Sequence, residues 1–216
     1  MKKLLSLLLL SCFLLTACGQ GRAEPPSVSC EILREEGAGS SYAEYPAYSR
    51  SGAGYDALSA ALEDLNRAWQ EGAGDFLAGG EPPRCQSVSA SVTRCDSRAV
   101  CLVVTRTLEE GGPHPNTYSE AHVLDPATGE PLLLTDFLTV DAALSRTVQD
   151  LLYESYPELD FDRALVEREV DAALESPDLL WYFWEDQLCI GFPEGSFGFS
   201  HAEGSLGVLL PLPAEG

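Results

Sequence analysis

The sequence predicts an α+β fold, an antiparallel sheet with about three amphipathic helices. Three observations predict this class. Short apolar runs alternate with polar residues as strands do, and three longer segments repeat apolar residues at helical spacing. The expected strands are joined mainly by hairpins, and the helices gather between groups of strands. The 216 residues and the hydrophobic content of 45% are enough for one globular domain.

The first eighteen residues have the pattern of a bacterial lipoprotein signal. Lys2 and Lys3 precede an apolar run that ends near Leu15, which is shorter than the roughly 20 apolar residues of a membrane-crossing helix. The sequence Leu15-Thr16-Ala17-Cys18 looks like a lipobox, in which cleavage leaves a lipid-bearing cysteine at the N-terminus. A plain secretory signal that is cleaved nearby is the alternative.

This pattern predicts an extracytoplasmic, lipid-anchored protein. Residues 1–17 are expected to be the signal peptide and residues 18–27 a tether from the lipid to the fold. Cys18 is the expected lipidation site, and its lipid is the expected contact with the membrane. Each buried methylene contributes about 0.8 kcal/mol, so several acyl chains together give a stable anchor.

The charge of the chain limits its partners. There are 13 Lys and Arg against 34 Asp and Glu, which gives a formal net charge of −21, and loss of the signal removes two lysines but no acid. Nucleic acid and anionic lipid headgroups carry the same sign, so they are poor partners. Cationic partners stay open, although solubility outside the cell also explains such acidity.

Five cysteines are disulfide candidates once Cys12 leaves with the signal and Cys18 is acylated. Cys95 and Cys101 stand symmetrically about Arg98, so a short hairpin loop would place them opposite each other, and they form the best candidate pair. Five is odd, so at least one thiol is free or pairs between chains. No spacing fits a Cys-x-x-Cys redox or zinc pattern, so neither a metal nor a cofactor is predicted.

The expected strands follow from alternation. Val28, Cys30 and Ile32 alternate as a first strand, and Gln86–Arg94 alternates between an apolar face and a face of serines and Thr93. Val100–Leu108, whose start suggests burial on both faces, returns beside it across a turn at residues 96–98. The remaining expected strands are 117–124, 132–134, 179–184, 187–192 and 206–212.

Three segments predict helices. In Asp56–Gln70 the apolar residues recur on one face that includes Trp69, which we interpret as a core anchor, and Gly72 is a candidate helix end. Asp141–Tyr156 and Asp162–Leu174 are also amphipathic and are separated by a proline. The segment 125–129 has the chemistry of a turn, because its proline fixes one dihedral and its glycine allows positive φ.

A central motif resembles a known family. The sequence Gly111-Gly112-Pro113-His114-Pro115-Asn116, followed by a strand and by the segment Leu124–Leu138 (Leu-Asp-Pro-Ala-Thr-Gly-Glu-Pro-Leu-Leu-Leu-Thr-Asp-Phe-Leu), is similar to the RsiV-like extracytoplasmic domain. This domain of unknown function occurs outside the membrane in a lysozyme-sensing anti-sigma factor and beside a peptidoglycan deacetylase. The resemblance covers residues 28–105 as the N-terminal half and 106–212 as the C-terminal half. Pro113 and the Gly-rich tail 193–204 depart from the family pattern.

The resemblance implies a binding or sensing module of the cell envelope and not an enzyme. We expect this chain to lack the sigma-binding segment and membrane span of the anti-sigma factor, and the catalytic domain of the deacetylase. The implied ligand is lysozyme, which is commonly basic, or a cell-wall glycan. The motif residues that we expect to bind it are Gly111, Gly112, His114, Pro115 and Asn116.

A catalytic interpretation is the alternative, namely an envelope hydrolase or deacetylase that uses His114 and His122 with carboxylates. Tyr118, Glu120 and His122 share one face of the expected strand, where a general base could act. No His-Glu-x-x-His or Gly-x-Ser-x-Gly pattern supports this interpretation. His114 stands between two prolines, where a ring that bonds the loop's own carbonyls is the simpler explanation.

The aromatic run 179–184 is a second candidate for ligand contact, because exposed aromatic rings stack on sugars. A buried strand explains it more simply. Alternation would place Trp181 and Phe183 on one face and Tyr182 and Trp184 on the other, so one of the two faces could be exposed to solvent.

Overall fold

A computed structural model describes residues 24–81, 83–112, 114–199 and 204–212. The signal peptide and Cys18 lie outside the described residues. The helices and strands are β1 (Ser27–Glu36), β2 (Tyr42–Ser51), α2 (Asp56–Ala78), β3 (Cys85–Cys95), β4 (Val100–Glu109), β5 (Asn116–Leu124), α3 (Ala142–Ser155), α4 (Arg163–Glu175), β6 (Leu180–Trp184), β7 (Gln187–Phe192) and β8 (Leu206–Pro211). The α+β class is confirmed. None of the helices in these residues is long and apolar enough to cross a membrane.

The strands form two sheets, and one of them is mixed. The first has the order β1-β2-β3-β4-β5 and the second has the order β6-β7-β8. All neighbours are antiparallel except β2 and β3, which pair in parallel through Tyr42 with Cys85 and Ala43 with Gln86. The expectation of a wholly antiparallel sheet is therefore wrong. The connection through α2 explains the difference, because a helical crossover returns the chain in the same direction.

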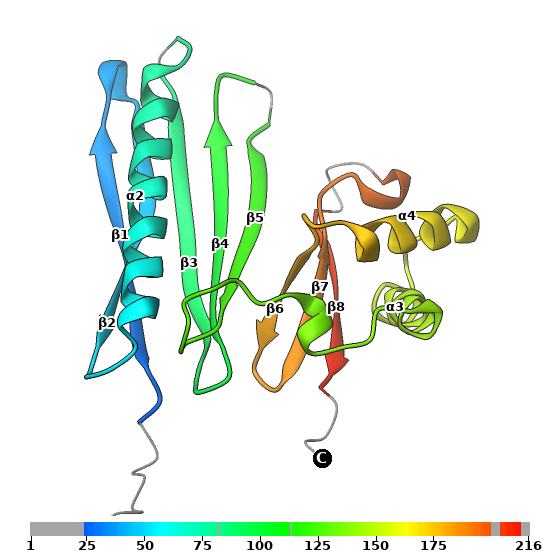
Figure 1. Cartoon of the computed structure of the whole chain (residues 1–216). Helices are drawn as coiled ribbons and strands as arrows, with labels where there is room; N and C mark the ends of the chain where they lie inside the picture. The colour runs from blue at the N-terminus through cyan, green and yellow to red at the C-terminus, as the bar shows by residue number, and fades with distance from the viewer. Residues whose placement is uncertain (1–23, 82, 113, 200–203, 213–216) are drawn as a thin grey trace, which may run out of the picture.

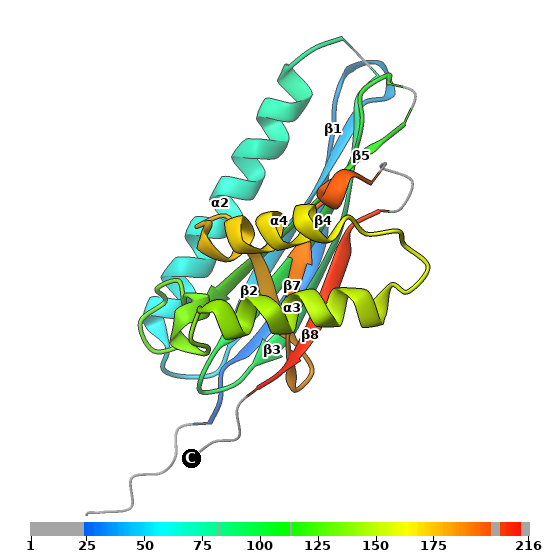
Figure 2. The same ribbon diagram turned by 90° about the vertical axis from the view of Figure 1, so that its right-hand side faces the viewer.

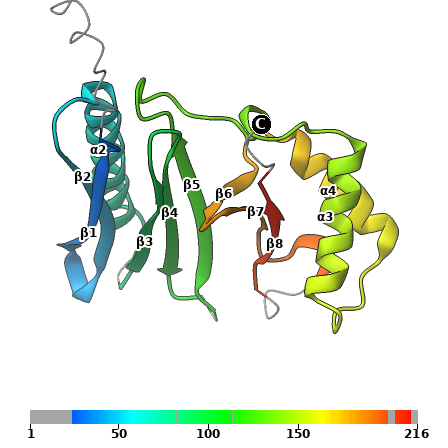
Figure 3. The ribbon, with the colours of Figure 1, turned by 90° about the horizontal axis from the view of Figure 1, so that it is seen from below.

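The elements stack in layers (Figures 1 and 3). Helix α2 covers one face of the five-stranded sheet, and its apolar stripe meets β2 and β4 in one core. Strand β6 lies beside β5 and also contacts β3 and β4. Figure 2 shows α3 and α4 side by side over the second sheet, where they enclose the other core.

The five-stranded sheet opens between β2 and β3 after only two residue pairs. Beyond that point, side chains take over the role of the missing backbone bonds. The amide of Asn66 on α2 accepts from the N–H of Tyr48 at 2.7 Å and donates to its carbonyl at 2.8 Å. Gln86 donates to the carbonyl of Glu44, and Glu44 accepts from the N–H of Val88. These side chains therefore provide hydrogen-bond partners for backbone groups of Tyr48 and Glu44 at the opened edge of β2.

The hairpin between β3 and β4 forms as predicted, but it does not bring Cys95 and Cys101 together. The carboxylate of Asp96 closes the turn by accepting from the backbone N–H groups of Arg98 and Ala99. Burial disfavours its charge, but these donors and Arg94 outweigh burial and lower the pKa of Asp96.

A register shift beside Thr93 places Cys101 opposite Arg94 and Cys95 opposite Val100. Cys101 then points into the core under α3 and α4, while Cys95 packs on the α2 side and donates to the carbonyl of Pro26 at 3.0 Å. Both thiols are free, as are those of Cys30, Cys85 and Cys189. The predicted disulfide is not formed in this structure because the bulge turns the two side chains to opposite faces.

Helix α2 is longer than predicted. Gly72 does not end it, because the apolar stripe continues through Ala73 to Phe76 and Leu77, which pack against the sheet. A glycine inside a helix costs about 1 kcal/mol, and burial of this stripe exceeds that cost. The other two helices begin one residue later than predicted, because Asp141 and Asp162 are their N-caps and their carboxylates accept from the first-turn N–H groups.

The expected strand at residues 132–134 is absent. Pro131 forms a single bridge with Leu124, after which residues 134–136 turn as a short 3₁₀ helix. Asp136 accepts from the N–H of Leu133 at 2.7 Å, and this local bond favours the turn over an extended strand. The predicted division of the domain at residue 105 falls inside β4, whereas the two sheets separate between β5 and β6.

The two ends of the described chain lie at the same end of the molecule. In Figure 1, β1 begins and β8 finishes at the bottom, and the tips of the β1–β2 and β4–β5 hairpins lie at the top. The ten residues of β1, at about 3.3 Å each, span roughly 30 Å. The part of the central motif at the β4–β5 tip is therefore held away from the N-terminal end of the fold, whereas its second part, the turn 125–129, lies beside the start of α2.

Candidate functional site

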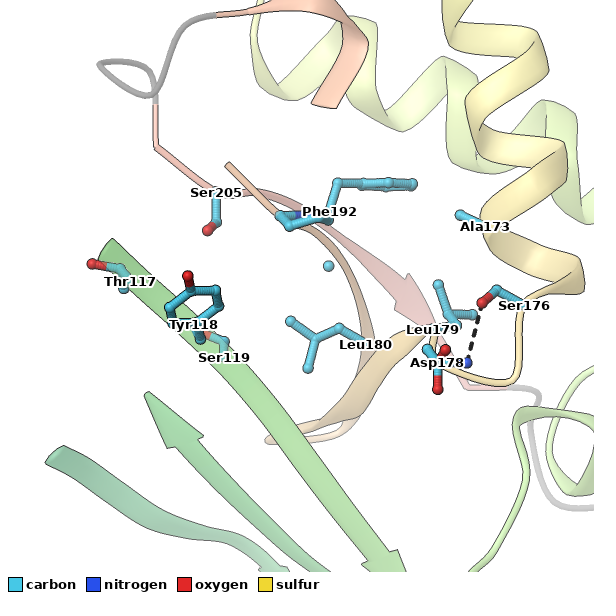
Figure 4. A pocket seen from close by; sticks show the side chains of 12 residues that line it. Thr117, Tyr118, Ser119, Ala173, Ser176, Asp178, Leu179, Leu180, Phe192 and Ser205 are labelled. Carbon is cyan, nitrogen blue, oxygen red and sulfur yellow. Dashed lines mark hydrogen bonds between the residues drawn. The ribbon is translucent and has the colours of Figure 1, made fainter. Parts of the chain in front are cut away.

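A cleft of about 300 Å³ lies between the two sheets, where the edge strand β5 meets the start of β6. Figure 4 shows Thr117, Tyr118 and Ser119 along β5, with Leu180 at the centre and Ser176 and Asp178 beyond it. Its remaining lining residues are Ala173, Leu179, Gly191, Phe192, Pro193 and Ser205. The cleft combines apolar walls with hydroxyl groups and one carboxylate, which is the composition of a small-ligand site.

Local bonds and burial shape this cleft. Ser176, just after α4, accepts from the backbone N–H of Asp178 at 3.1 Å and so turns the chain into β6. Phe192 is buried in the core of the second sheet, whereas the side chain of Tyr118 is 51% exposed. Tyr118 is thus an accessible aromatic ring at the wall of a partly enclosed cleft.

Four of the five motif residues predicted to bind ligand line a separate hollow. Gly111, Gly112, His114 and Pro115 surround a space of about 310 Å³ at the tip of the β4–β5 hairpin, together with Pro83, Cys85 and Glu109. Asn116 instead begins β5, two residues before Tyr118. Asn116 lines neither this hollow nor the cleft, so the five motif residues do not all meet at one site.

His122 belongs to a polar cluster under α2 on the opposite face of β5. Its Nε2 lies 3.6 Å from a carboxylate oxygen of Glu120, and Arg106 lies 3.3 Å from the same carboxylate. The indole of Trp69 meets the His122 ring edge-on, and Arg106 lies over the indole. Burial alone would raise the pKa of Glu120, but the His122 ring and the Arg106 guanidinium outweigh it and lower that pKa.

This cluster is largely buried, although Trp69, Arg106 and Glu120 border a small hollow of about 220 Å³. Trp69 is 8% exposed, as expected for a core anchor, and Arg106 Nε and His122 Nε2 are buried. His122 also borders a hollow of about 550 Å³ between α2 and the turn 125–131. His114 lies in the hollow at the hairpin tip instead, so the structure does not bring these two histidines together. In the described ranges, no group of three or more His, Cys, Asp or Glu is placed to hold a metal ion.

The aromatic run forms β6, and its two faces differ. Phe183 is fully buried and packs with Phe137 and Trp181, whereas Trp184 is 49% exposed. Tyr182 is half-buried opposite Cys189. Burial raises the pKa of the Cys189 thiol and also that of Cys101, which makes both poor nucleophiles at neutral pH.

Helices α3 and α4 and the segments beside them present an acidic surface. We call this the acidic layer. Its exposed carboxylates are Asp150, Glu154, Glu158, Asp160, Glu167, Asp171 and Glu175. Tyr153 lies among several of them with Arg163 above its ring, and burial together with the negative charges raises the pKa of its hydroxyl. The ion pairs found in the described residues involve other parts of the molecule, so these carboxylates are left without a cationic partner.

Sequence reasoning missed the cleft between the sheets. Ser176, Asp178 and Ser205 come from segments far from β5 in the chain, and no local pattern connects them. The sequence does hold one signal for the polar surface of the sheet that borders this cleft. The serines of β3 alternate with apolar residues, and the same alternation of small hydroxyl residues recurs at Thr105 and Thr107 on β4.

Comparison with known proteins identifies solved structures that have a similar fold. No family model matches the sequence, and no curated protein matches it. Among solved structures, a DUF3298 family member from Bacteroides fragilis NCTC 9343 aligns with a TM-score of 0.59 and 12% sequence identity, over 87% of this chain and 91% of that chain. A DUF3298 family protein from Pseudomonas aeruginosa PAO1 aligns with a TM-score of 0.56 and 14% identity, over the same shares.

The chain therefore has the fold of DUF3298 domains, which are domains of unknown function. At 12% and 14% identity the likeness concerns the fold alone. The likeness to DUF3298 proteins supports the prediction that this chain is a domain of unknown function.

Proposed function

We propose that this protein is an RsiV-like recognition module of the bacterial cell envelope, held outside the membrane by lipid on Cys18, and that its ligand is a basic protein such as lysozyme. The observation that carries the proposal is the acidic layer, whose exposed carboxylates lack cationic partners in the described structure. The proposed role is binding and not catalysis.

Charge acts mainly on the rate of encounter. An acidic surface on a chain with a net charge of −21 attracts a cationic partner over about one Debye length, roughly 10 Å at 0.1 M salt. Such steering raises association rates by about 10- to 1000-fold. The complex is therefore expected to form faster at low salt, with a smaller effect of salt on its dissociation.

The shape of the fold suits this role. A tether at residues 18–27 would join the fold at the start of β1, and the hairpin tips lie at the opposite end (Figure 1). A membrane anchor at Cys18 would leave those tips and the acidic layer accessible to soluble proteins.

The test is binding of a basic lysozyme to the full chain in detergent, measured by calorimetry and by stopped-flow kinetics at low and moderate salt. One variant carries Asp150→Asn, Glu154→Gln and Glu167→Gln, which remove three of the seven carboxylates of the acidic layer and leave the helix-capping aspartates intact. We expect the association rate of this variant to fall by about tenfold at low salt.

A matched control removes the same amount of charge elsewhere. This variant carries Glu63→Gln, Glu71→Gln and Asp75→Asn, three changes on the exposed side of α2. We expect it to associate nearly as fast as the wild type. Absence of binding at both salt concentrations would refute the proposal. Equal slowing in both variants would show that net charge acts without a defined surface, which would also contradict it.

A further inference from the structure

We propose that the protein also binds an uncharged oligosaccharide, along the side of β3, β4 and β5 that faces away from α2 and in the adjoining cleft. This site goes beyond the proposed protein ligand and uses a different surface. The argument starts from one set of side chains, here called the hydroxyl face. Its members are Ser87, Ser89, Ser91, Thr105, Thr107, Thr117 and Ser119.

Strand register places these hydroxyl groups in rows across three strands. Ser87 pairs with Thr107, and Thr107 pairs with Thr117. In the next row, Ser89 pairs with Thr105, which pairs with Ser119 in turn. Neighbouring strands lie about 4.8 Å apart, so each row is a line of closely spaced hydroxyls.

Most of these hydroxyls are available for a ligand. Thr105 and Ser119 share a hydrogen bond of 3.0 Å, and Ser87 shares one of 3.0 Å with Tyr42. Within the described ranges the other four hydroxyls form no hydrogen bond with the protein, and Ser89 and Ser91 are exposed. A hydroxyl both donates and accepts, as do the hydroxyls of a sugar, so the two surfaces match in either direction.

The hydroxyl face continues into the cleft between the sheets. Thr117 and Ser119 belong to both, and Asp178 adds a carboxylate that can accept from sugar hydroxyls (Figure 4). Tyr118 alternates with Thr117 and Ser119 along the edge strand, but it also lines the cleft there, and its ring, which is 51% exposed, is available to the apolar face of a sugar. A volume of about 300 Å³ is at the lower end of the range for small ligands, so the cleft fits a short segment of the chain and not a large group.

Charge selects the class of oligosaccharide. The neighbouring positions on the same side of these strands, Val103 and Ala121, are uncharged as well, although the chain carries 34 acidic and 13 basic residues. Glu109 stands at the hairpin end of this face, and Asp178 lies in the cleft. An anionic glycan would meet these carboxylates and the negative field of the whole protein, so a neutral one is favoured.

The experiment titrates the full chain in detergent with a neutral oligosaccharide, tetra-N-acetylchitotetraose, and with an anionic galacturonic acid tetramer, followed by calorimetry and tyrosine-region NMR. We expect the neutral tetramer to saturate the protein with a Kd of about 1 mM or below, and the anionic tetramer not to bind. Tyr118→Ala should weaken binding by about tenfold, and Ser119→Ala by a smaller factor.

Trp184→Ala is the matched control, because Trp184 is 49% exposed but does not line the cleft, and we expect it to bind as the wild type does. The acidic-layer variant should also keep oligosaccharide binding, so the two proposals fail or succeed separately. No saturation by the neutral tetramer at about 10 mM would overturn the inference. Equal loss of binding in Tyr118→Ala and Trp184→Ala would overturn it too.

Discussion

Replacing Gly129 by alanine is expected to lower the free energy of unfolding by about 3 kcal/mol. Gly129 has φ of 72°, and a Cβ there would lie 2.6 Å from the carbonyl oxygen of Ala57 at the start of α2. The left-handed backbone costs a non-glycine residue about 1–2 kcal/mol, and the clash with fixed backbone adds about 1–3 kcal/mol. Urea unfolding followed by circular dichroism measures the loss.

Gly54 provides the control for the backbone contribution. Its φ is 79°, but nothing lies within 4 Å of a Cβ built there. Gly54→Ala should therefore lose only about 1–2 kcal/mol. Equal losses in the two variants would contradict close packing of the turn 125–129 against α2.

Phe183→Ala is expected to cost about 3–5 kcal/mol, because this ring is fully buried where the two sheets meet. It packs edge-on against Phe137 with ring centroids 5.0 Å apart, and the Arg94 guanidinium of β3 lies 4.5 Å from its centroid. Truncation would leave a cavity and remove the cation–π contact between β6 and β3. Urea unfolding measures this loss as well.

The next residue along β6 supplies the comparison. Trp184 is 49% exposed, and Trp184→Ala should change stability by about 1 kcal/mol or less. Similar losses at the two positions would mean that β6 does not place Phe183 against the five-stranded sheet.

Much of the fold could be predicted from local patterns. The alternation in residues 86–94 predicts β3, and the apolar faces predict all three α-helices of the described structure. Backbone geometry sets the period of each element, and burial of one face makes that period visible as a pattern of apolar residues. The predicted starts of α3 and α4, Asp141 and Asp162, are one residue early, because these aspartates are the N-caps. These features depend on residues close together in the chain.

The wrong or missing predictions concern features that depend on contacts between residues far apart in the chain. Strand β2 was not predicted as a strand, and its parallel pairing with β3 depends on residues 42–43 meeting residues 85–86. The bulge near Thr93 separates Cys95 from Cys101, and spacing alone cannot show a bulge. The cleft joins β5 to segments around residues 176–180 and 191–193, so no short motif marks it.

The two proposed ligands use separate surfaces of one fold. The acidic layer covers the outer side of the second sheet, and the hydroxyl face belongs to the first (Figure 3). A module that contacts a glycan with one surface and a basic protein with the other would be suited to detecting a protein that works on the cell wall.

All of these roles require that the chain works outside the cell on a lipid anchor. The most direct test is intact-mass and tandem mass spectrometry of the protein recovered from the membranes of its native host. We expect a polypeptide that begins at Cys18 and carries acyl chains on that residue. A polypeptide that keeps Met1, or one with an unmodified Cys18, would contradict the account.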